Sequence, residues 1–598
     1  MKKLSEFKID KNNILIHPEK NIETFNYSDG DLIENYIFDV LEKIADKRSN
    51  SDELEQYIKD WPTIYHFSKS RVNLLRFLEE YISFNVNLLE IGSGCGALTR
   101  YFGEKFKRVD AIESSYRRAL ITRKRTSDLK NVRIFVTDFN NVKIEPEYDI
   151  VTLIGVLEYS PLFIKRRTED IFEPARTILK NAFYSLKEKG ILIIAIENRL
   201  GLKYWLGFRD DHTDKLNDSL MGYPLSLKRN CPITFSRNEL INLLKNEGFN
   251  FVKFYYPFPD YKTPNIILSE KGCSLANQLN IYNLFDSFYE DYSGQRKYIT
   301  FNDILINKSI IEENLMNILS NSFLILASKN NNLNLEEFIF KKYTTYRKNN
   351  FITETTLKEE NGKYYVYKKP IFKSNEILDS SIKHNITEKE LYIKGKLLVF
   401  DLIEYINTPD LIPKLIEYLK MIKNLSIERF SVNKIDEDGF DLLDGKSVDF
   451  TFWNLIRDEI NYQNLIYIDR EWEFNDNIPI DFLVFRNLFY FLTKYSIEQK
   501  ISLLDLIYKI MKEIFSNYKL ERLLKIIKIE ENFQNIVLNR KQDLFKILKE
   551  SKPIRYIEDY QMYIEYLENE INKIKQSRGW KLLQIYYKIK TILKRGVK

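Results

Sequence analysis

Short apolar runs alternate with amphipathic, helix-like segments through the first half of the chain. Five runs fall between residues 88 and 196 and a sixth follows later: Leu88–Ile91, Val109–Ile112, Val132–Val136, Ile150–Ile154, Ile191–Ile196 and Phe323–Ala327. Mostly apolar strands separated by helices are typical of βαβ units, whose parallel sheet is buried on both faces. The pattern therefore predicts an α/β domain over residues 59–330, with the sixth run as the last strand of its sheet.

The same pattern of apolar and polar positions divides the rest of the chain into three parts. Residues 1–58 predict an N-terminal helical cover, and the polar run Lys329–Asn332 reads as a linker after the sheet. Alternating strands and then helical patterns predict an α+β domain over residues 331–548. Residues 549–598 predict a helical tail.

A glycine-rich loop follows the first apolar run. Glu90 is followed by Gly92, Gly94 and Gly96 at alternate positions, and a helix-like segment begins at Ala97. Glycines let the backbone turn sharply and approach a ligand, while a helix N-terminus presents unpaired N–H groups. A tight structural turn is the alternative reading of this spacing.

Acidic residues stand where the predicted strands end. They are Glu90, Glu113, Asp138, Glu158 and Glu197. Carboxylates accept hydrogen bonds from ribose hydroxyls or an adenine amino group and attract a sulfonium cation, but they repel pyrophosphate. The strand ends therefore favour a nucleoside ligand without a phosphate chain.

Composition narrows the class of protein. The 598 residues carry a net charge of only +6, which argues against a dedicated nucleic-acid binder. The three cysteines are scattered and form neither a disulfide framework nor a zinc spacing, so a reducing cytoplasm is expected. No signal peptide and no run of 18 apolar residues occurs. The sequence thus predicts a cytoplasmic protein, and it assigns no certain metal ligand.

The glycine loop with its acidic strand ends resembles the class I S-adenosylmethionine-dependent methyltransferases, which have a Rossmann-like sheet. The resemblance implies that Glu90, Gly92, Gly94 and Gly96 belong to the donor site and that Glu113 holds the donor's ribose. It implies that Asp138 and Phe139 border the adenine.

Five longer segments resemble the methyltransferases of bacterial surface-polysaccharide gene clusters, and this resemblance covers about residues 25–330. The segments are Tyr65–Ser68, Gly94–Tyr101, Ile154–Tyr159, Glu197–Tyr204 and Tyr255–Tyr261. The acceptor implied is a glycan or a lipid-linked glycan.

A sugar hydroxyl is a poor nucleophile, so a base is expected near the donor's methyl group. Residues 210–214 cluster three carboxylates around His212, one of four histidines. We predict His212 as the base, with Asp211 or Glu197 orienting it. A solvated loop is the alternative.

The second domain resembles the catalytic core of kinases. A hairpin turn at Asn361-Gly362 leads to Lys368 on a strand, and a helix carrying Glu388 and Glu390 is expected after His384. The spacing of Asp449, Asn454 and Asp469 suits the residues that, in kinases, take the acceptor's proton and hold Mg²⁺, with Lys368 and Glu388 at the ATP phosphates.

This second resemblance has departures. Ser447 stands where kinases usually have histidine, Asp469 is followed by no glycine, and no glycine-rich phosphate loop precedes Lys368. An α+β domain whose Asp and Asn residues cap helices and form turns is the alternative.

The tail carries two patterns. Apolar residues from Tyr560 to Ile574 step by three and four, which predicts a short coiled coil or a helix that packs back on its own domain. Trp580–Lys598 predicts a basic amphipathic helix that lies on the inner face of a membrane, docks on a partner or is simply solvated.

The sequence thus predicts an enzyme that O-methylates a sugar of a surface polysaccharide or its lipid-linked precursor. The order of domains also resembles the methyltransferase-kinases that terminate O-antigen chains, so one alternative is a bifunctional enzyme that caps a glycan. The other is a scaffold that recruits glycosyltransferases through the middle domain and tail.

Overall fold

The computed structural model describes most of the chain. The described residues are 2–17, 30–164, 169–226, 231–289, 302–330, 335, 337–372, 381–406, 408–457, 464–495, 501–550, 557–577, 579, 580, 583, 584 and 587. Most of the basic helix predicted over Trp580–Lys598 lies outside these residues.

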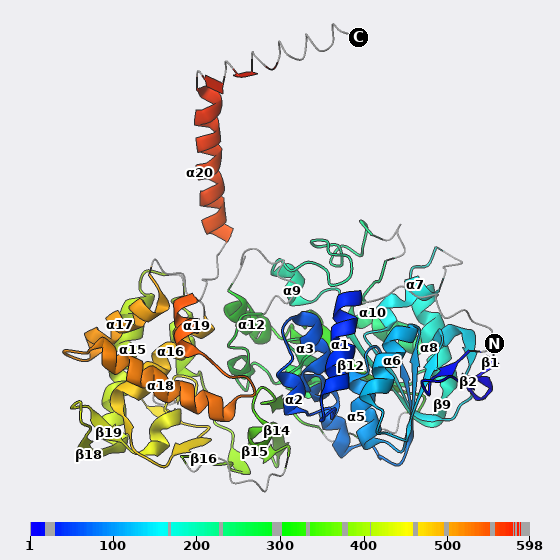
Figure 1. The fold of residues 1–598 in the computed structure, drawn as a ribbon, viewed down its shortest axis with the longest axis horizontal. Coiled ribbons are helices and arrows are strands. Elements are labelled where there is room, and N and C mark those ends of the chain that lie inside the picture. The colour runs from blue at the N-terminus through cyan, green and yellow to red at the C-terminus, as the bar shows by residue number, and fades with distance from the viewer. Residues whose placement is uncertain are drawn as a thin grey trace.

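A Rossmann-like sheet organises the first half of the molecule (Figure 1). Five strands of its parallel block have the spatial order β9, β8, β4, β5, β6, and the short strand β3 (Leu15–Ile16) adds to β6 in parallel. The bounds are β4 Asn87–Ile91, β5 Arg108–Glu113, β6 Val132–Val136, β8 Tyr148–Ile154 and β9 Leu186–Glu197. The five apolar runs between residues 88 and 196 therefore form the predicted parallel strands, and their carboxyl ends meet at one edge.

Alternate residues of these strands face two different layers of helices. Leu89 and Ile91 pack in one core with α8 and α10, whereas Leu88 packs in another core with α5 and α6. The helices of this half are α1 Asp31–Lys43, α2 Asp52–Glu55, α3 Trp61–Phe67, α4 Asn73–Arg76, α5 Ala97–Lys105, α6 Tyr116–Arg125, α7 Ser160–Phe163, α8 Glu173–Ser185, α9 Leu202–Trp205, α10 Arg237–Asn246, α11 Glu270–Ser274, α12 Asp303–Glu312 and α13 Met316–Leu319. The two-residue side-chain period of a strand accounts for this layering.

The sheet does not end where the sequence pattern predicts. The run Phe323–Ala327 forms β12 (Ser322–Ser328), but β12 lies between β9 and β10 inside a sheet of 14 strands. The remaining strands of that sheet are β2 Lys8–Ile9, β3 Leu15–Ile16, β10 Phe251–Phe258, β11 Ile266–Ser269, β13 Phe340–Tyr343, β14 Thr353–Glu360, β15 Lys363–Pro370 and β17 Lys389–Leu391. The predicted domain boundary near residue 330 thus falls between two strands of one sheet, because β13 pairs with β11.

The predicted hairpin after this point is present, but the helix after it is not. Asn361 and Gly362 turn between β14 and β15 with φ of +52° and +74°. Glu388 and Glu390 lie in an edge segment that ends in β17, where the N–H of Lys368 donates to the carbonyl of Glu388 at 3.2 Å. The prediction of a helix here was wrong: the open edge of β15 takes this segment as a strand and overrides its local helix propensity.

Helices dominate the chain after residue 397. They are α14 Leu398–Ile403, α15 Leu411–Phe430, α16 Ile480–Lys494, α17 Leu503–Ile514, α18 Leu520–Val537, α19 Leu544–Glu550 and α20 Ile557–Gln576. The short strands outside the large sheet are β1 Lys2–Lys3, β7 Val142–Lys143, β16 Ile382–His384, β18 Ser431–Ile435, β19 Asp441–Leu443, β20 Leu455–Arg457, β21 Leu465–Tyr467, β22 Trp472–Phe474 and β23 Ile478–Pro479.

Helix α20 projects away from the body (Figure 1). Of the predicted apolar seam, the side chains of Ile564, Leu567, Ile571 and Ile574 are exposed. This part of α20 therefore does not pack back on its own domain, and the coiled coil stays a prediction. No described helix is both long and apolar enough to cross a membrane.

Candidate functional site

The glycine loop connects β4 to α5 and is fixed at two points. Gly92, Gly94 and Gly96 all have positive φ, at +77°, +55° and +80°. A Cβ on Gly92 would lie 2.6 Å from Cγ2 of Val156, and one on Gly96 would lie 2.9 Å from Cα of Thr122. A Cβ on Gly94 would meet nothing within 4 Å. The loop is therefore held against its neighbours at both ends and faces open space in the middle, where a ligand can approach the backbone.

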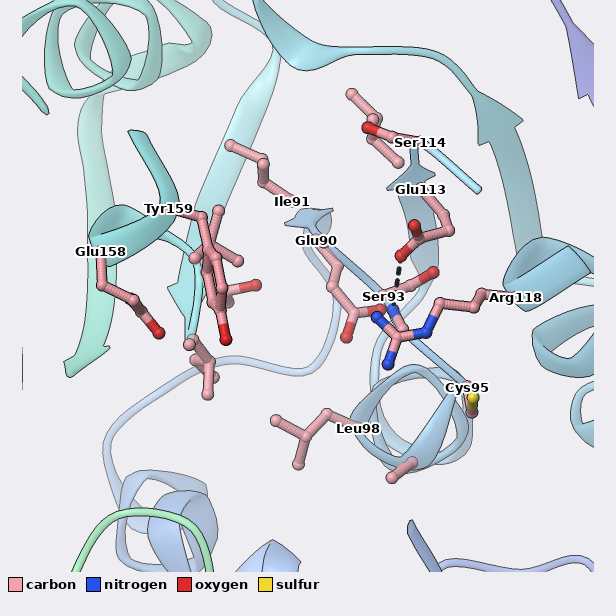
Figure 2. A pocket seen from close by; sticks show the side chains of 18 of the residues that line it. Glu90, Ile91, Ser93, Cys95, Leu98, Glu113, Ser114, Arg118, Glu158 and Tyr159 are labelled. Atoms are coloured by element: carbon pink, nitrogen blue, oxygen red, sulfur yellow. Dashed lines mark hydrogen bonds between the residues drawn. The ribbon is translucent and has the colours of Figure 1, made fainter. Parts of the chain in front are cut away.

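Glu113 ends β5 and orients this loop. Figure 2 shows the Glu113 side chain directed toward the loop near Ser93. Its Oε2 accepts a hydrogen bond from the N–H of Gly94 at 2.8 Å, and its Oε1 accepts one from the N–H of Ser115 at 2.9 Å. Burial raises the pKa of Glu113, and its backbone hydrogen bonds oppose that rise. On the next strand, Oδ1 of Asp138 accepts from the N–H of Asn140 at 2.9 Å, and Phe139 is buried.

Glu90, at the end of β4, keeps an unpaired oxygen. The residue is buried and its Oε2 has no hydrogen-bond partner. Burial raises the pKa of Glu90 to about 8. A buried carboxylate without a partner is costly, so this one suits a cationic or hydrogen-bond-donating ligand.

These groups line one cavity of about 270 Å³. Of the residues predicted for donor and acceptor, its lining contains Glu90, Gly92, Gly94, Glu113, Asp138, Phe139, Asp211 and His212. Six of the seven predicted donor residues thus converge, and the predicted acceptor loop reaches the same space. Gly96, which packs against Thr122, and Glu197 are not in the lining.

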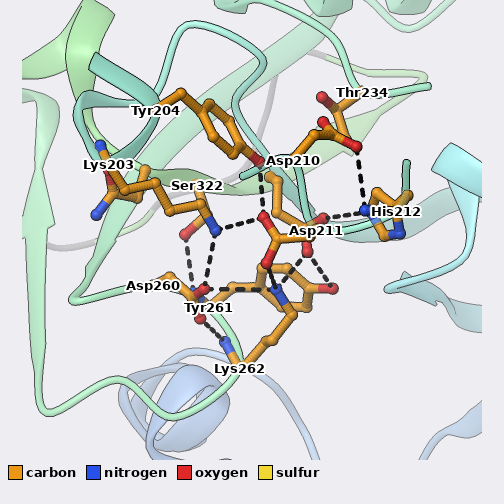
Figure 3. A network of polar contacts seen from close by, with 12 residues as sticks. Lys203, Tyr204, Asp210, Asp211, His212, Thr234, Asp260, Tyr261, Lys262 and Ser322 are labelled. Carbon is orange, nitrogen blue, oxygen red and sulfur yellow. Dashed lines mark hydrogen bonds and ion pairs between the residues drawn. The ribbon is translucent and has the colours of Figure 1, made fainter. Parts of the chain in front are cut away.

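A second polar group also lines this cavity, through Asp211, His212 and Lys262. Figure 3 shows the polar contacts around these residues. His212 follows α9 in a loop, and its Nε2 lies 3.5 Å from Oε2 of Glu197 at the end of β9. Burial lowers the pKa of His212, but the charge of Glu197 outweighs burial and raises the pKa to about 9. Of the two predicted orienting residues, Glu197 is the one paired with the imidazole.

Asp211 has other partners. Its Oδ2 pairs with Nζ of Lys203 at 2.6 Å and accepts from the hydroxyl of Tyr204 at 2.7 Å. Its Oδ1 lies 3.2 Å from Nζ of Lys262, which also pairs with Oε1 of Glu197. Burial raises the pKa of Asp211, but Lys203 and Lys262 outweigh it and hold the pKa well below its usual range.

Sequence reasoning noted Glu158 only as an acidic strand end and gave it no role. It is fully buried on the short helical turn Leu157–Tyr159 and lines the cavity. Neither of its carboxylate oxygens has a hydrogen-bond partner, and burial raises its pKa to about 8. Lys262 was missed as well, although it directly follows the segment Tyr255–Tyr261 that carries part of the family resemblance.

Four of the five residues predicted for the second domain also come together. Lys368 pairs with Asp469, and the side-chain amide of Asn454 donates to the carbonyl of Asp449 at 3.0 Å and to that of Asp469 at 3.4 Å. Oδ2 of Asp449 accepts from the N–H groups of Glu471 and Trp472 at 2.9 and 2.7 Å.

The fifth predicted residue, Glu388, does not join this group, because its side chain is exposed on the edge segment. Glu471, which sequence reasoning passed over, takes the central place. It pairs with Arg347 at 2.8 Å and with Lys368 at 3.2 Å. Within the described part of the chain, no group of acidic, histidine or cysteine side chains suited to a metal ion includes Asp449 or Asp469.

Comparison with known proteins agrees with the first half of the chain. A family profile described as "Methyltransferase domain" matches residues 89–192. No curated protein matches the chain.

Three similar solved structures are methyltransferases. A possible histamine N-methyltransferase from Thermotoga maritima is 16% identical, with a TM-score of 0.26 over 49% of this chain and 100% of that one. Phosphoethanolamine N-methyltransferase 2 from Haemonchus contortus, bound to S-adenosylhomocysteine, is 16% identical, with a TM-score of 0.28 over 48% and 61%. The N-methyltransferase NodS from Bradyrhizobium japonicum is 25% identical, with a TM-score of 0.19 over 23% and 70%. The family profile thus identifies residues 89–192 as similar to a methyltransferase domain and specifies no substrate.

Proposed function

We propose that this protein transfers a methyl group from S-adenosylmethionine to an oxygen atom of a sugar, in a cell-surface polysaccharide or its lipid-linked precursor. One observation carries the proposal: a single cavity runs from the loop held by Glu113 to the polar group around His212. The glycan acceptor rests on the sequence resemblance of five segments between residues 65 and 261.

The donor end of the cavity fits this cofactor. Gly94 leaves open space for a close approach, and Glu113 carries the carboxylate that the ribose hydroxyls need. The unpaired oxygen of Glu90 suits the positive charge of the donor. When bound, S-adenosylmethionine supplies an electrophilic methyl group on its sulfonium, so this chain has to align the acceptor more than to activate the donor.

The acceptor end is polar and buried, which favours a hydroxylated acceptor over an apolar one. Glu197, Asp211 and His212 provide hydrogen-bond acceptors and donors within one network. The acceptor's proton has to leave as the new C–O bond forms. We assign its removal to the neutral form of His212, oriented by Glu197; because the pKa of His212 is about 9, the imidazole has to lose its own proton first.

The donor half of the proposal is tested by calorimetric titration of S-adenosylhomocysteine into the full chain. Gly94→Ala places a methyl group in the open space of the cavity and should weaken binding about tenfold or more, by steric exclusion and backbone strain. Gly439→Ala is the matched control, because Gly439 also has positive φ and open surroundings but lies outside the cavity lining. No binding by the folded wild type, or equal binding by Gly94→Ala, contradicts the donor site.

The acceptor half is tested with isotopically labelled donor and a panel of lipid-linked oligosaccharides. Label released from the product as an O-methyl sugar supports the proposal. Label found only on an amine or a protein would identify a different acceptor.

A second candidate, the capping methyltransferase-kinase, is favoured by the convergence of Lys368, Asp449, Asn454 and Asp469. Titration of Mg²⁺-ATP into the full chain tests it, with Asp469→Ala as the variant. Binding that the variant lacks would support a nucleotide site. No binding at millimolar ATP would leave a recruitment role for glycosyltransferases as the proposal for this half.

A further inference from the structure

Three buried side chains at the acceptor end direct polar atoms toward one another. Both carboxylate oxygens of Glu158 have no hydrogen-bond partner, whereas Oε2 of Glu197 and Nε2 of His212 lie 3.5 Å apart as an ion pair and make no hydrogen bond. One ligand atom from each residue lies within 4.8 Å of those from the other two. Buried polar groups are nearly always paired, so this convergence calls for a missing partner.

The spacing of these atoms suits one shared cation. Carboxylate oxygens and imidazole nitrogens lie about 2.0–2.2 Å from a transition-metal ion, so two ligands of the same ion are at most about 4.4 Å apart. Small side-chain movements would bring the three groups within that range. Within the described residues, this is the one group of such side chains with metal-ligand spacing.

Two lysines next to the three side chains hold Glu197 in place but do not neutralise all of the nearby carboxylates. Lys262 pairs with Oε1 of Glu197 and leaves Oε2 to face the group. Lys203 and Lys262 provide two positive charges against the four carboxylates of Glu158, Glu197, Asp211 and Asp260. With all four carboxylates ionised and a neutral imidazole, the group carries two negative charges in excess, which a divalent cation would balance.

We propose that Glu158, Glu197 and His212 bind one divalent transition-metal cation. Two carboxylates with one imidazole suit Mn²⁺ or Zn²⁺ better than Mg²⁺ or Ca²⁺, which prefer oxygen ligands alone. Lys262 acts as a positioning residue through its contact with Glu197.

The inference deepens the proposed function and rests on it for the role of the ion. Glu158 and His212 line the cavity, so the ion would lie where it can hold an acceptor oxygen. His212 then serves as a ligand, and the acceptor's proton leaves to solvent. The assignment of His212 as base is replaced, while the methyl transfer itself is kept.

The test uses the full chain, stripped with a chelator and titrated by calorimetry with Mn²⁺ and, separately, with Zn²⁺. We expect one tightly bound ion per chain. Glu158→Gln, which keeps the side-chain volume, should lower the affinity about tenfold or more. Glu188→Gln, an exposed position at the opposite end of β9, should leave the affinity unchanged.

Pulsed electron paramagnetic resonance of the Mn²⁺ form gives a second, independent readout. It should detect one directly bound imidazole nitrogen that His212→Gln removes and His17→Gln retains. This signal does not depend on how well Glu158→Gln folds.

The same samples are titrated with S-adenosylhomocysteine, so the two proposals fail separately. If the folded protein binds this nucleoside but neither ion, or if Glu158→Gln binds the ion as well as the wild type, the inference is overturned and the methyltransferase proposal stands. Absence of nucleoside binding overturns the proposed function whatever the metal titration shows.

Discussion

Two acidic clusters in this protein differ in what their carboxylates contact. In the cavity of the methyltransferase domain, Glu90 has one oxygen and Glu158 both oxygens without a partner, although both residues are buried. In the second half of the chain, Glu471 pairs with Arg347 and Lys368, and Asp449 accepts two backbone N–H bonds. The first cluster is incomplete without a ligand, whereas the second is largely completed by the protein itself.

This difference distinguishes two roles of a buried carboxylate, one structural and one in ligand binding. A carboxylate paired with an arginine costs the fold little, and the pair becomes part of the architecture. An unpaired buried carboxylate destabilises the empty protein, and that cost is recovered when a ligand binds. The cavity therefore carries the stronger evidence for a binding function, and the cluster around Glu471 carries the stronger evidence for a structural one.

Arg347→Met tests whether the cluster around Glu471 is structural, and it should give the largest loss in the free energy of unfolding. Removing one partner from a buried ion pair costs about 3–5 kcal/mol, because the other charge is left uncompensated. We expect a loss of about 3 kcal/mol here, since Glu471 keeps Lys368 as a second partner. Urea denaturation of the full chain measures it.

The matched control is Lys383→Met, which removes the exposed lysine of the Lys383–Glu473 pair and should change little. Equal, small effects of both substitutions would mean that the Glu471 cluster is not structural. S-adenosylhomocysteine binding should stay unchanged in both variants.

Glu90→Gln tests the cavity cluster, whose carboxylates lack partners, through the pH dependence of the protein's stability. The pKa of Glu90 is about 8 in the folded protein, above that of an unfolded glutamate, so the folded state retains its proton longer. The two states bind it equally below about pH 4, and stability then falls as the pH rises toward 8. Replacing the carboxyl removes this loss.

The gain of Glu90→Gln over the wild type should therefore be near zero at pH 4 and about 2–3 kcal/mol at pH 6.5, which is about two units above the unfolded pKa of 4.5, at about 1.4 kcal/mol per unit. Denaturation of the ligand-free protein at both pH values measures it. A gain that does not change with pH would show that Glu90 is ionised or paired in the folded state, and the comparison would lose its main example.

The parallel sheet and the donor loop could be predicted from local sequence patterns. The runs forming β4, β5, β6, β8 and β9 are mostly apolar, with at most one polar residue in each. Gly92, Gly94 and Gly96 occupy positive-φ positions, for which glycine is the usual residue. Both features depend on residues close together in the sequence.

Features that depend on distant partners were not predictable in the same way. The pairing of Ile266 with Lys342 carries the sheet across the predicted boundary, and the open edge of β15 makes a strand where Glu388 and Glu390 favour a helix. Glu158 and Lys262 resemble any other charged residues until the fold buries them beside Glu197. Sequence alone indicated the acidic strand ends, but not which of them lack a partner.

Glu113→Ala gives the smallest of these expected effects. It sharpens the comparison from within the cavity, because the carboxylate of Glu113, unlike those of Glu90 and Glu158, accepts two backbone hydrogen bonds. Its loss removes the acceptor of the Gly94 N–H and the group assigned to the ribose. Donor affinity should fall by about 1–3 kcal/mol, the range for stranding a hydrogen-bonded partner. Calorimetry with S-adenosylhomocysteine measures this, with Glu145→Ala, an exposed carboxylate paired with Lys3, as the control. If affinity is unchanged while Gly94→Ala still abolishes binding, Glu113 only shapes the loop, and the ribose is held by another group of the cavity.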